Sequence, residues 1–203
     1  MGFKYDQNYK LAVGQENWFR RVTMKKRLSN IDKAIKSWKH KRVLDIGCSG
    51  GMLQKLLSSQ CREVYGLDIN LDQLNETGIE GNYVCGDAMQ LPFKENDFDV
   101  VICSHLLEHL PSVQKSIQEI NRILRPKGNF FVLYPIELFR GATCIPDVLL
   151  HGQKISRIRK IHLHRLSLKK LKRWLSDTEL RLMRHKLIFA LQPMYLAVMM
   201  KIK

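Results

Sequence analysis

Short apolar runs alternate with helical patterns of hydrophobic positions through the middle of the chain. Buried parallel strands are apolar on both faces, and the run at 98–103 has this character. Hydrophobic residues at helical spacing follow three of the runs, at 52–57, 71–74 and 113–124, and Pro126 ends the last of these helices. The runs that we predict to be β-strands are 42–46, 63–67, 83–85, 98–103 and 129–134.

The order of these elements predicts an α/β fold. Strand and helix alternate over about 90 residues, and parallel strands joined by helices take right-handed crossovers. The prediction is therefore a Rossmann-like, doubly wound and mostly parallel sheet, which binds its ligand at the carboxyl ends of the strands.

The composition is typical of a single globular domain. The chain has 203 residues, 45% of them hydrophobic, with 12 Gly and 6 Pro, which excludes a disordered or fibrous protein. Five cysteines form no C-x-x-C pair, so we expect neither a disulfide scaffold nor a zinc ribbon, and a reducing cytoplasm fits. The first residues lack the apolar segment of a signal peptide, and no run approaches the roughly 18 apolar residues of a transmembrane span.

Charge is unevenly distributed along the chain. Residues 1–42 hold 12 basic and 3 acidic side chains, residues 43–150 hold 8 and 14, and residues 151–203 hold 14 and 2. The net charges of these segments are therefore +9, −6 and +12, within a total of +15. Solvated helix faces would explain the basic ends; alternatively, both ends meet on one surface that binds something anionic.

Three predicted strands end in residues that suit a nucleoside. The first leads into the loop from Asp45 to Gly51, whose glycines let the backbone approach a ligand beside a helix N-terminus. The second ends at Asp68, a carboxylate that can accept hydrogen bonds from both ribose hydroxyls. The third ends at Asp87 and Ala88, where a carboxylate and a backbone N–H can bind an adenine edge. One nucleoside lying across the sheet would contact all three.

The glycine spacing narrows the choice of ligand. Gly47, Gly50 and Gly51 do not form the G-x-G-x-x-G loop of dinucleotide-binding oxidoreductases, and the chain has no P-loop sequence. The negative charge of Asp45 would repel a pyrophosphate, whereas it would attract the cationic amino-acid end of a cofactor.

The same segments resemble a known family. The sequence VLDIGCSGG at 43–51 resembles motif I of the class I S-adenosylmethionine-dependent methyltransferases, and 67–69 and 86–88 resemble their ribose-binding acid and adenine-binding loop. Residues 93–110 and 124–129 are similar to the fourth strand with its following loop, and to the turn into the fifth strand, in the methyltransferase type 11 branch. Ser49 departs from the pattern, because many members have the middle glycine of G-x-G there, which puts the backbone angle at Ser49 in question.

The resemblance implies a cofactor and a site. S-adenosyl-L-methionine would bind and leave as S-adenosyl-L-homocysteine. The residues implied to bind it are Asp45, Gly47, Cys48, Ser49, Gly51, Asp68, Ile69, Asp87, Ala88, Met89 and Ser104.

The resemblance also implies how the domain is organised. The sheet would have seven strands and be closed by an antiparallel pair at 180–189 and 193–202, which accounts for the apolar C-terminus. A single methyltransferase domain would span 1–203. Its parts would be a helical cap at 1–40, a cofactor-binding core at 41–135, an acceptor-site segment at 136–165, and the last helix with the closing strands at 166–203.

One motif competes with this interpretation. His105-Leu106-Leu107-Glu108-His109 matches H-x-x-E-H, an inverted zinc-protease signature. We expect no metal, because the motif directly follows a buried strand, no third ligand stands out downstream, and type 11 relatives commonly have a similar E-H without metal. A sulfonium methyl is already activated, so His105 and His109 are instead candidate bases for a hydroxyl acceptor, with Glu108 orienting one of them. Alternatively, both histidines only pack.

The acceptor is expected to be anionic. The family builds its acceptor site from the N-terminal helix and the segment after the fifth strand, and both are bordered by basic residues here. We expect a small-molecule, lipid-linked or glycan-linked acceptor that is methylated at oxygen, in the cytoplasm or at a membrane surface. The N/D-P-P-Y/F motif is absent after the fourth strand, which argues against methylation of adenine N6 or glutamine. An RNA methyltransferase and a non-catalytic, partner-binding subunit remain alternatives.

Overall fold

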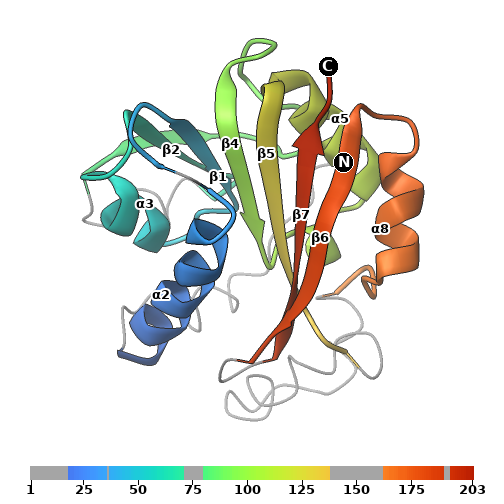
Figure 1. Ribbon diagram of the computed structural model, residues 1–203, viewed down its shortest axis with the longest axis horizontal. Coiled ribbons are helices and arrows are strands. Elements are labelled where there is room, and N and C mark those ends of the chain that lie inside the picture. Colours follow the sequence, from blue (N-terminus) through green and yellow to red (C-terminus); the bar gives the residue numbers. More distant parts are fainter. Residues whose placement is uncertain (1–17, 36, 71–79, 138–161, 190–192) are drawn as a thin grey trace.

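A seven-stranded sheet forms the centre of the computed structural model, which describes residues 18–203 except 36, 71–79, 138–161 and 190–192 (Figure 1). The strands are β1 (Arg42–Ile46), β2 (Glu63–Asp68), β3 (Asn82–Cys85), β4 (Phe98–Ser104), β5 (Leu124–Pro135), β6 (Leu180–Ile188) and β7 (Met194–Lys201). They lie in the order β3-β2-β1-β4-β5-β7-β6, with β1 to β5 parallel and β7 antiparallel to both its neighbours. The predicted α/β fold, including the antiparallel C-terminal pair, is confirmed.

The strand order reverses between β1 and β4. β2 and β3 follow β1 on one side, whereas β4 and the later strands lie on the other. In doubly wound sheets the ligand crevice lies at such a reversal, outside the carboxyl ends of the strands. The fold therefore directs attention to the loops after β1 and β4.

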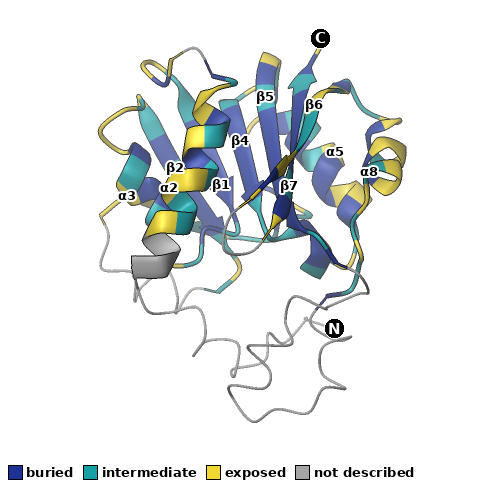
Figure 2. Ribbon diagram, turned by 60° about the horizontal axis from the view of Figure 1, so that its bottom comes forward, coloured by how far each residue is buried: buried dark blue, intermediate teal, exposed yellow. Residues whose placement is uncertain are grey.

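Helices cover both faces of the sheet (Figures 1 and 2). α2 (Trp18–Asp32) and α3 (Met52–Leu57) lie on one face, and α5 (Val113–Ile123) and α8 (Leu168–Leu175) on the other. Each face has its own hydrophobic cluster: Leu28 and Leu53 belong to the first, and Ile117 and Leu171 to the second. The serines before α5 and α8 accept hydrogen bonds from the backbone of the first helical turn, which explains where these helices begin.

β5 begins five residues before its predicted start at 129. Leu124 caps α5 and already pairs with Phe98, and the register then shifts so that Val100 pairs with Asn129. Lys127 has a left-handed φ of 64° inside this irregular stretch. The Pro126–Gly128 turn therefore lies within an irregular β5 and does not separate helix from strand, because a bulge absorbs it.

β7 accounts for the apolar C-terminus. Its residues from Leu196 to Met199 are buried between the two layers of helices, so the hydrophobicity belongs to the sheet core. Within the described part of the chain, none of the helices has the length and apolar character that crossing a membrane requires. The helix expected around 71–74 lies outside the described residues, as does most of the acceptor-site segment at 136–165.

Candidate active site

The loop between β1 and α3 is tied to the end of β2. The backbone N–H groups of Gly47 and Cys48 donate to the carbonyl oxygen of Leu67 at 2.7 and 3.1 Å. The N–H of Ser49 donates to Oδ2 of Asp68 at 2.9 Å. Ser49 has a φ of 46°, so the serine adopts the left-handed conformation that glycine takes at low cost. The departure from G-x-G thus keeps a glycine-like backbone.

Asp68 and a second carboxylate, that of Asp87, lie at the same edge. Oδ1 of Asp68 accepts the N–H of Asn70 at 3.0 Å, and Oδ1 of Asp87 accepts the N–H of Met89 at 2.8 Å. A backbone hydrogen bond from Gly86 to the carbonyl of Asp68, at 3.0 Å, joins the two loops. Both carboxylates are half-buried and held in place by their own loops, so their remaining lone pairs have fixed directions.

Asp45 is buried at the end of β1, with 5% of its surface exposed. Its Oδ2 is 3.4 Å from Nε2 of Gln54, which comes from α3. Burial raises the pKa of Asp45 to about 7, the negative charge of Asp68 adds to this rise, and Gln54 and Arg27 oppose it. A buried carboxylate of this kind is stabilised by any cationic group that enters beside it.

Ser104 and His105, at the end of β4, are held by Arg27 of α2. Nη1 of Arg27 donates to Oγ of Ser104 at 3.1 Å, and Nη2 lies 3.1 Å from Nε2 of His105. Because arginine can only donate, Nε2 of His105 accepts and its ring proton is on Nδ1, which faces Oε1 of Glu108 at 3.5 Å. Burial lowers the pKa of His105, so the ring is neutral. His105 can act as a base only after Arg27 releases Nε2.

His109 faces a different group of residues. Its ring packs edge-to-face on the ring of His162, with centroids 4.7 Å apart. Nδ1 of His162 is 2.6 Å from Oε1 of Glu137, and both side chains are buried. The two candidate bases therefore point to different surroundings, His105 toward α2 and His109 toward His162.

All the predicted cofactor residues lie at the carboxyl ends of β1 to β4, along one edge of the sheet. The sequence did not single out Arg27, Gln54 or Glu137, and it indicated no metal-binding role for His162. Gln54 and Arg27 carry no motif, and their contacts exist only because α2 and α3 pack beside the sheet. For His162 the residue type itself was a signal of a functional site, because metal sites and acid–base sites use histidine most often.

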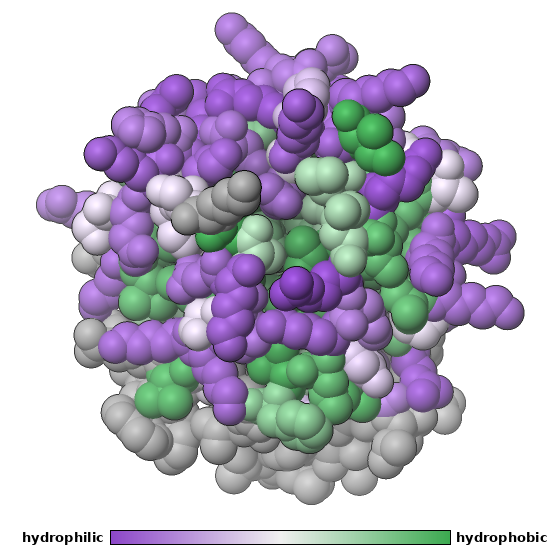
Figure 3. Space-filling model, in the orientation of Figure 1, coloured by the Kyte–Doolittle hydropathy of each residue, from purple (hydrophilic) through white to green (hydrophobic). Residues whose placement is uncertain are grey.

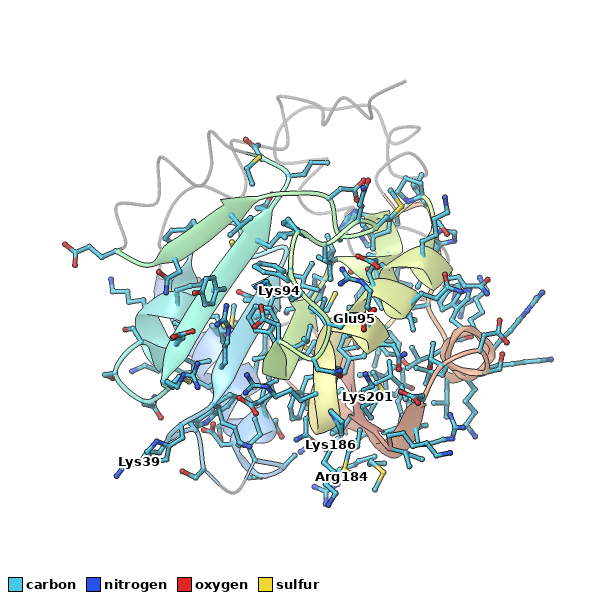
Figure 4. The ribbon with its side chains drawn as sticks, turned by 90° about the horizontal axis from the view of Figure 1, so that it is seen from above. Lys39, Lys94, Glu95, Arg184, Lys186 and Lys201 are labelled. Carbon is cyan, nitrogen blue, oxygen red and sulfur yellow. The ribbon has the colours of Figure 1, made fainter. Side chains whose placement is uncertain are left out.

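Basic residues from both ends of the chain meet beside α2. Nζ of Lys186, on β6, donates to Oδ1 of Asn30, on α2, at 2.7 Å. Burial lowers the pKa of Lys186, and the positive charges of Lys33 and Arg184 lower it further. In Figure 4, Lys39, Arg184 and Lys186 lie along the same side of the molecule.

The strand register connects Lys186 with Ser104. Lys186 pairs with Leu196, Leu196 with Leu133, and Leu133 with Ser104, so all four residues lie in one row across the sheet. With three strand spacings of about 4.8 Å each, this row brings Lys186 to within about 15 Å of Ser104 along the carboxyl edge.

The same face also exposes hydrophobic side chains. In Figure 3 they gather in the middle of the face that α2, β6 and β7 form, and hydrophilic side chains surround them. Val22 of α2 and Met183 of β6 are among the exposed large hydrophobic residues. This face is therefore both basic and partly apolar.

A family model described as a methyltransferase domain matches residues 44–132, which include β1 to β4 and most of β5. The match covers 89 of the 203 residues and, together with the likeness of the fold to methyltransferase structures, supports a class I S-adenosylmethionine-dependent methyltransferase. The family that the glycine loop and the strand-end carboxylates indicated is thus supported, and the roles of these residues stay predictions.

About half of this chain is similar to several curated proteins. It is 36% identical over 106 residues to an uncharacterised protein of Methanocaldococcus jannaschii, covering 51% of this chain and 46% of that protein. It is 32% identical over 112 residues to the ubiquinone biosynthesis O-methyltransferase of Coxiella burnetii, covering 52% and 47%. It is 38% identical over 101 residues to a sterol 24-C-methyltransferase of Gibberella zeae, covering 45% and 27%. The chain spans about half the length, or less, of these curated relatives.

Solved structures match almost the whole of this chain. A complex of the Haloferax volcanii methyltransferase activator Trm112 with its methyltransferase gives a TM-score of 0.75 at 17% identity, covering 100% of both chains. A protein of Pyrococcus horikoshii gives 0.73 at 19% identity, covering 98% of this chain and 100% of that one. At these identities the likeness shows the fold.

Proposed function

We propose that the protein transfers a methyl group from S-adenosyl-L-methionine to an oxygen of an anionic acceptor. The observation that carries the proposal is the row of carboxylates, Asp45, Asp68 and Asp87, that ends three adjacent strands beside the glycine loop. S-adenosyl-L-methionine supplies a methyl group on a sulfonium, which needs alignment more than activation.

Each carboxylate suits one part of this cofactor. Asp68, anchored by the N–H groups of Ser49 and Asn70, has lone pairs left for the ribose hydroxyls. Asp87, anchored by Met89, would bind the adenine amino group. Asp45 would bind the ammonium of the methionine end, because a cation beside this buried carboxylate offsets the cost of ionising it.

The acceptor is proposed to be anionic because basic residues border the carboxyl edge. Lys186 and Lys33 repel one another there, and an anion between them would relieve that repulsion. Arg27 holds Ser104 and His105. An anionic acceptor that attracts Arg27 would release Nε2 of His105, which could then take the proton of an acceptor hydroxyl.

The acceptor is further proposed to have an apolar part, since the basic face also exposes Val22 and Met183. A small amphipathic acid or a lipid-linked or glycan-linked acceptor has this combination of charge and apolar surface. The O-methyltransferase among the relatives supports oxygen as the acceptor atom, while the sterol relative is a C-methyltransferase. Anionic lipid at a membrane surface would meet the same face, in the cytoplasm.

The test is transfer of labelled methyl from S-adenosyl-L-methionine to acceptors in matched pairs. We would compare protocatechuate with catechol, a hexose phosphate with the free hexose, and phosphatidylglycerol with phosphatidylcholine vesicles that carry a phenolic isoprenoid. We expect label in the anionic member of at least one pair. Lys186→Gln should then raise the KM for that acceptor several-fold, whereas Lys170→Gln, on an exposed side of α8, should not change it.

Other outcomes would contradict the proposal in different ways. Equal labelling of anionic and neutral members would contradict the anionic acceptor. Labelling of an RNA transcript alone would favour the RNA methyltransferase. Cofactor binding without label in any acceptor would favour the non-catalytic, partner-binding subunit.

A further inference from the structure

Three ligand-bearing side chains meet beyond the end of β4. Glu108 and His109, in the short 3-10 helix η2 (Leu107–His109), and His162, before α8, bring one ligand atom each to within 4.8 Å of the others. Glu108 and His162 are buried and His109 is half-buried. Their ligand types, two imidazoles and one carboxylate, are those of many zinc sites.

Backbone hydrogen bonds assemble this group. The carbonyl oxygen of Glu108 accepts the N–H groups of Leu163 at 2.8 Å and of His164 at 3.1 Å. Nε2 of His164 also bonds to the carbonyl oxygen of Leu110, at 2.9 Å. The segment that carries His162 is thereby fixed against η2, so the arrangement of ligands does not depend on side-chain rotamers alone.

The Glu108 carboxylate is buried without a hydrogen-bond partner for either oxygen among the residues that the structure describes. Only 1% of the surface of Glu108 is exposed. Nδ1 of His105 lies 3.5 Å from Oε1 of Glu108, which is too long for a good hydrogen bond. Buried polar atoms without hydrogen bonds are rare, and a bound cation would give both oxygens of Glu108 a partner.

The ring of His162 is hydrogen-bonded to a carboxylate, as the rings of metal-binding histidines often are. Oε1 of Glu137, on the segment after β5, lies 2.6 Å from Nδ1 of His162. The carboxylate fixes the ring orientation and places the proton on Nδ1, so Nε2 is the atom through which His162 would coordinate.

We propose that Glu108, His109 and His162 bind a divalent transition-metal cation of the zinc class, with Glu137 orienting His162. At metal–ligand distances of about 2.0–2.1 Å the ligand atoms would lie about 3.4 Å apart, so side-chain movements of about 1 Å complete the site. Three protein ligands leave a coordination position for water or another oxygen ligand.

This site differs from the H-x-x-E-H arrangement considered in the sequence. There, His105 and His109 would be ligands and Glu108 the base. Here His105 is turned toward Arg27, Glu108 is itself a ligand, and His162 supplies the third ligand, which the sequence did not reveal. The proposal therefore revises the expectation of no metal. It does not depend on the proposed methyl transfer.

The test is metal binding by the whole chain after treatment with a chelator. Zn²⁺ would be titrated by calorimetry, and Co²⁺ by its visible absorption, which reports nitrogen and oxygen coordination directly. We expect one high-affinity ion per chain. His109→Ala and His162→Ala should abolish it, and Glu137→Gln should weaken it about 10- to 100-fold. His40→Asn, at an exposed histidine outside the site, is the matched control and should bind as the wild type does.

Circular dichroism shows whether each variant folds, so that loss of metal binding can be distinguished from loss of structure. If either alanine variant fails to fold, Glu108→Gln and Glu137→Gln replace it, because both keep the side-chain volume. The proposal is overturned if the wild-type chain binds neither ion, or if folded His109 and His162 variants bind as tightly as His40→Asn.

Discussion

Replacing Asp45 by asparagine should make the protein without cofactor more stable above neutral pH. Burial raises the pKa of this carboxyl group from 3.8 to about 7, so the folded state holds the proton more tightly than the unfolded state does. The stabilising contribution of Asp45 is therefore complete below pH 3.8 and is lost as the pH rises to about 7. Asparagine has nearly the same shape as the protonated acid and cannot ionise.

The size of the effect follows from the pKa. At about 1.4 kcal/mol per pKa unit, ionising the buried carboxyl costs about 4 kcal/mol of folding free energy at about pH 8 and almost nothing at about pH 4. Since Asp45 is only 5% exposed, solvent screening reduces this little. The difference in unfolding free energy between Asp45→Asn and the wild type should thus grow from near zero to several kcal/mol over this range.

Urea unfolding of both proteins across this pH range measures the difference directly, because titrating groups that do not interact with Asp45 contribute equally to both. Asp177→Asn, at an exposed residue after α8, is the matched control and should stay within about 0.5 kcal/mol of the wild type. A difference that does not change with pH, or a variant less stable than the wild type at about pH 8, would refute the reasoning.

Two other substitutions test the glycine loop after β1 and the attachment of α2 to the sheet. Gly51 has a φ of 67° and an added Cβ would lie 2.2 Å from Oη of Tyr83, so Gly51→Ala should lower the unfolding free energy by about 1–3 kcal/mol in urea. Gly50→Ala meets nothing within 4 Å and should cost less than about 0.5 kcal/mol; equal effects would contradict this account. Arg27→Gln should weaken the attachment of α2 to β4 and increase amide hydrogen exchange along α2, whereas Lys26→Gln, at an exposed position, should not.

Strands β1 to β4 could be predicted to within one residue because buried parallel strands appear as apolar runs with clear ends. The strand-end carboxylates could be predicted for the same reason, since parallel topology brings the ends of β1, β2 and β3 to one edge. The start of β5 was wrong because Pro126 and Gly128 indicate a turn, and only the pairing of Phe98 with Leu124 extends the strand through it.

The rest of the site depends on contacts between distant segments. Arg27 reaches Ser104 across 77 positions of sequence, and periodicity carries no information about such a contact. His162 reaches η2 through backbone hydrogen bonds to Glu108, which any sequence could make. For Ser49 the sequence indicated where the backbone could be unusual, because a serine replaces the middle glycine of the motif. Only the structure gives its φ, which is left-handed as a glycine's would be.

Calorimetric titration with S-adenosyl-L-methionine, S-adenosyl-L-homocysteine and NAD tests the central claim most directly. We predict saturable one-to-one binding of the first two and none of NAD. Asp68→Ala, which removes the proposed ribose contacts, should weaken cofactor binding by about 2–3 kcal/mol, and Asp177→Ala should leave it unchanged. Binding of NAD, no binding of either methionine-derived cofactor, or equal affinity in Asp68→Ala and the wild type would contradict the account.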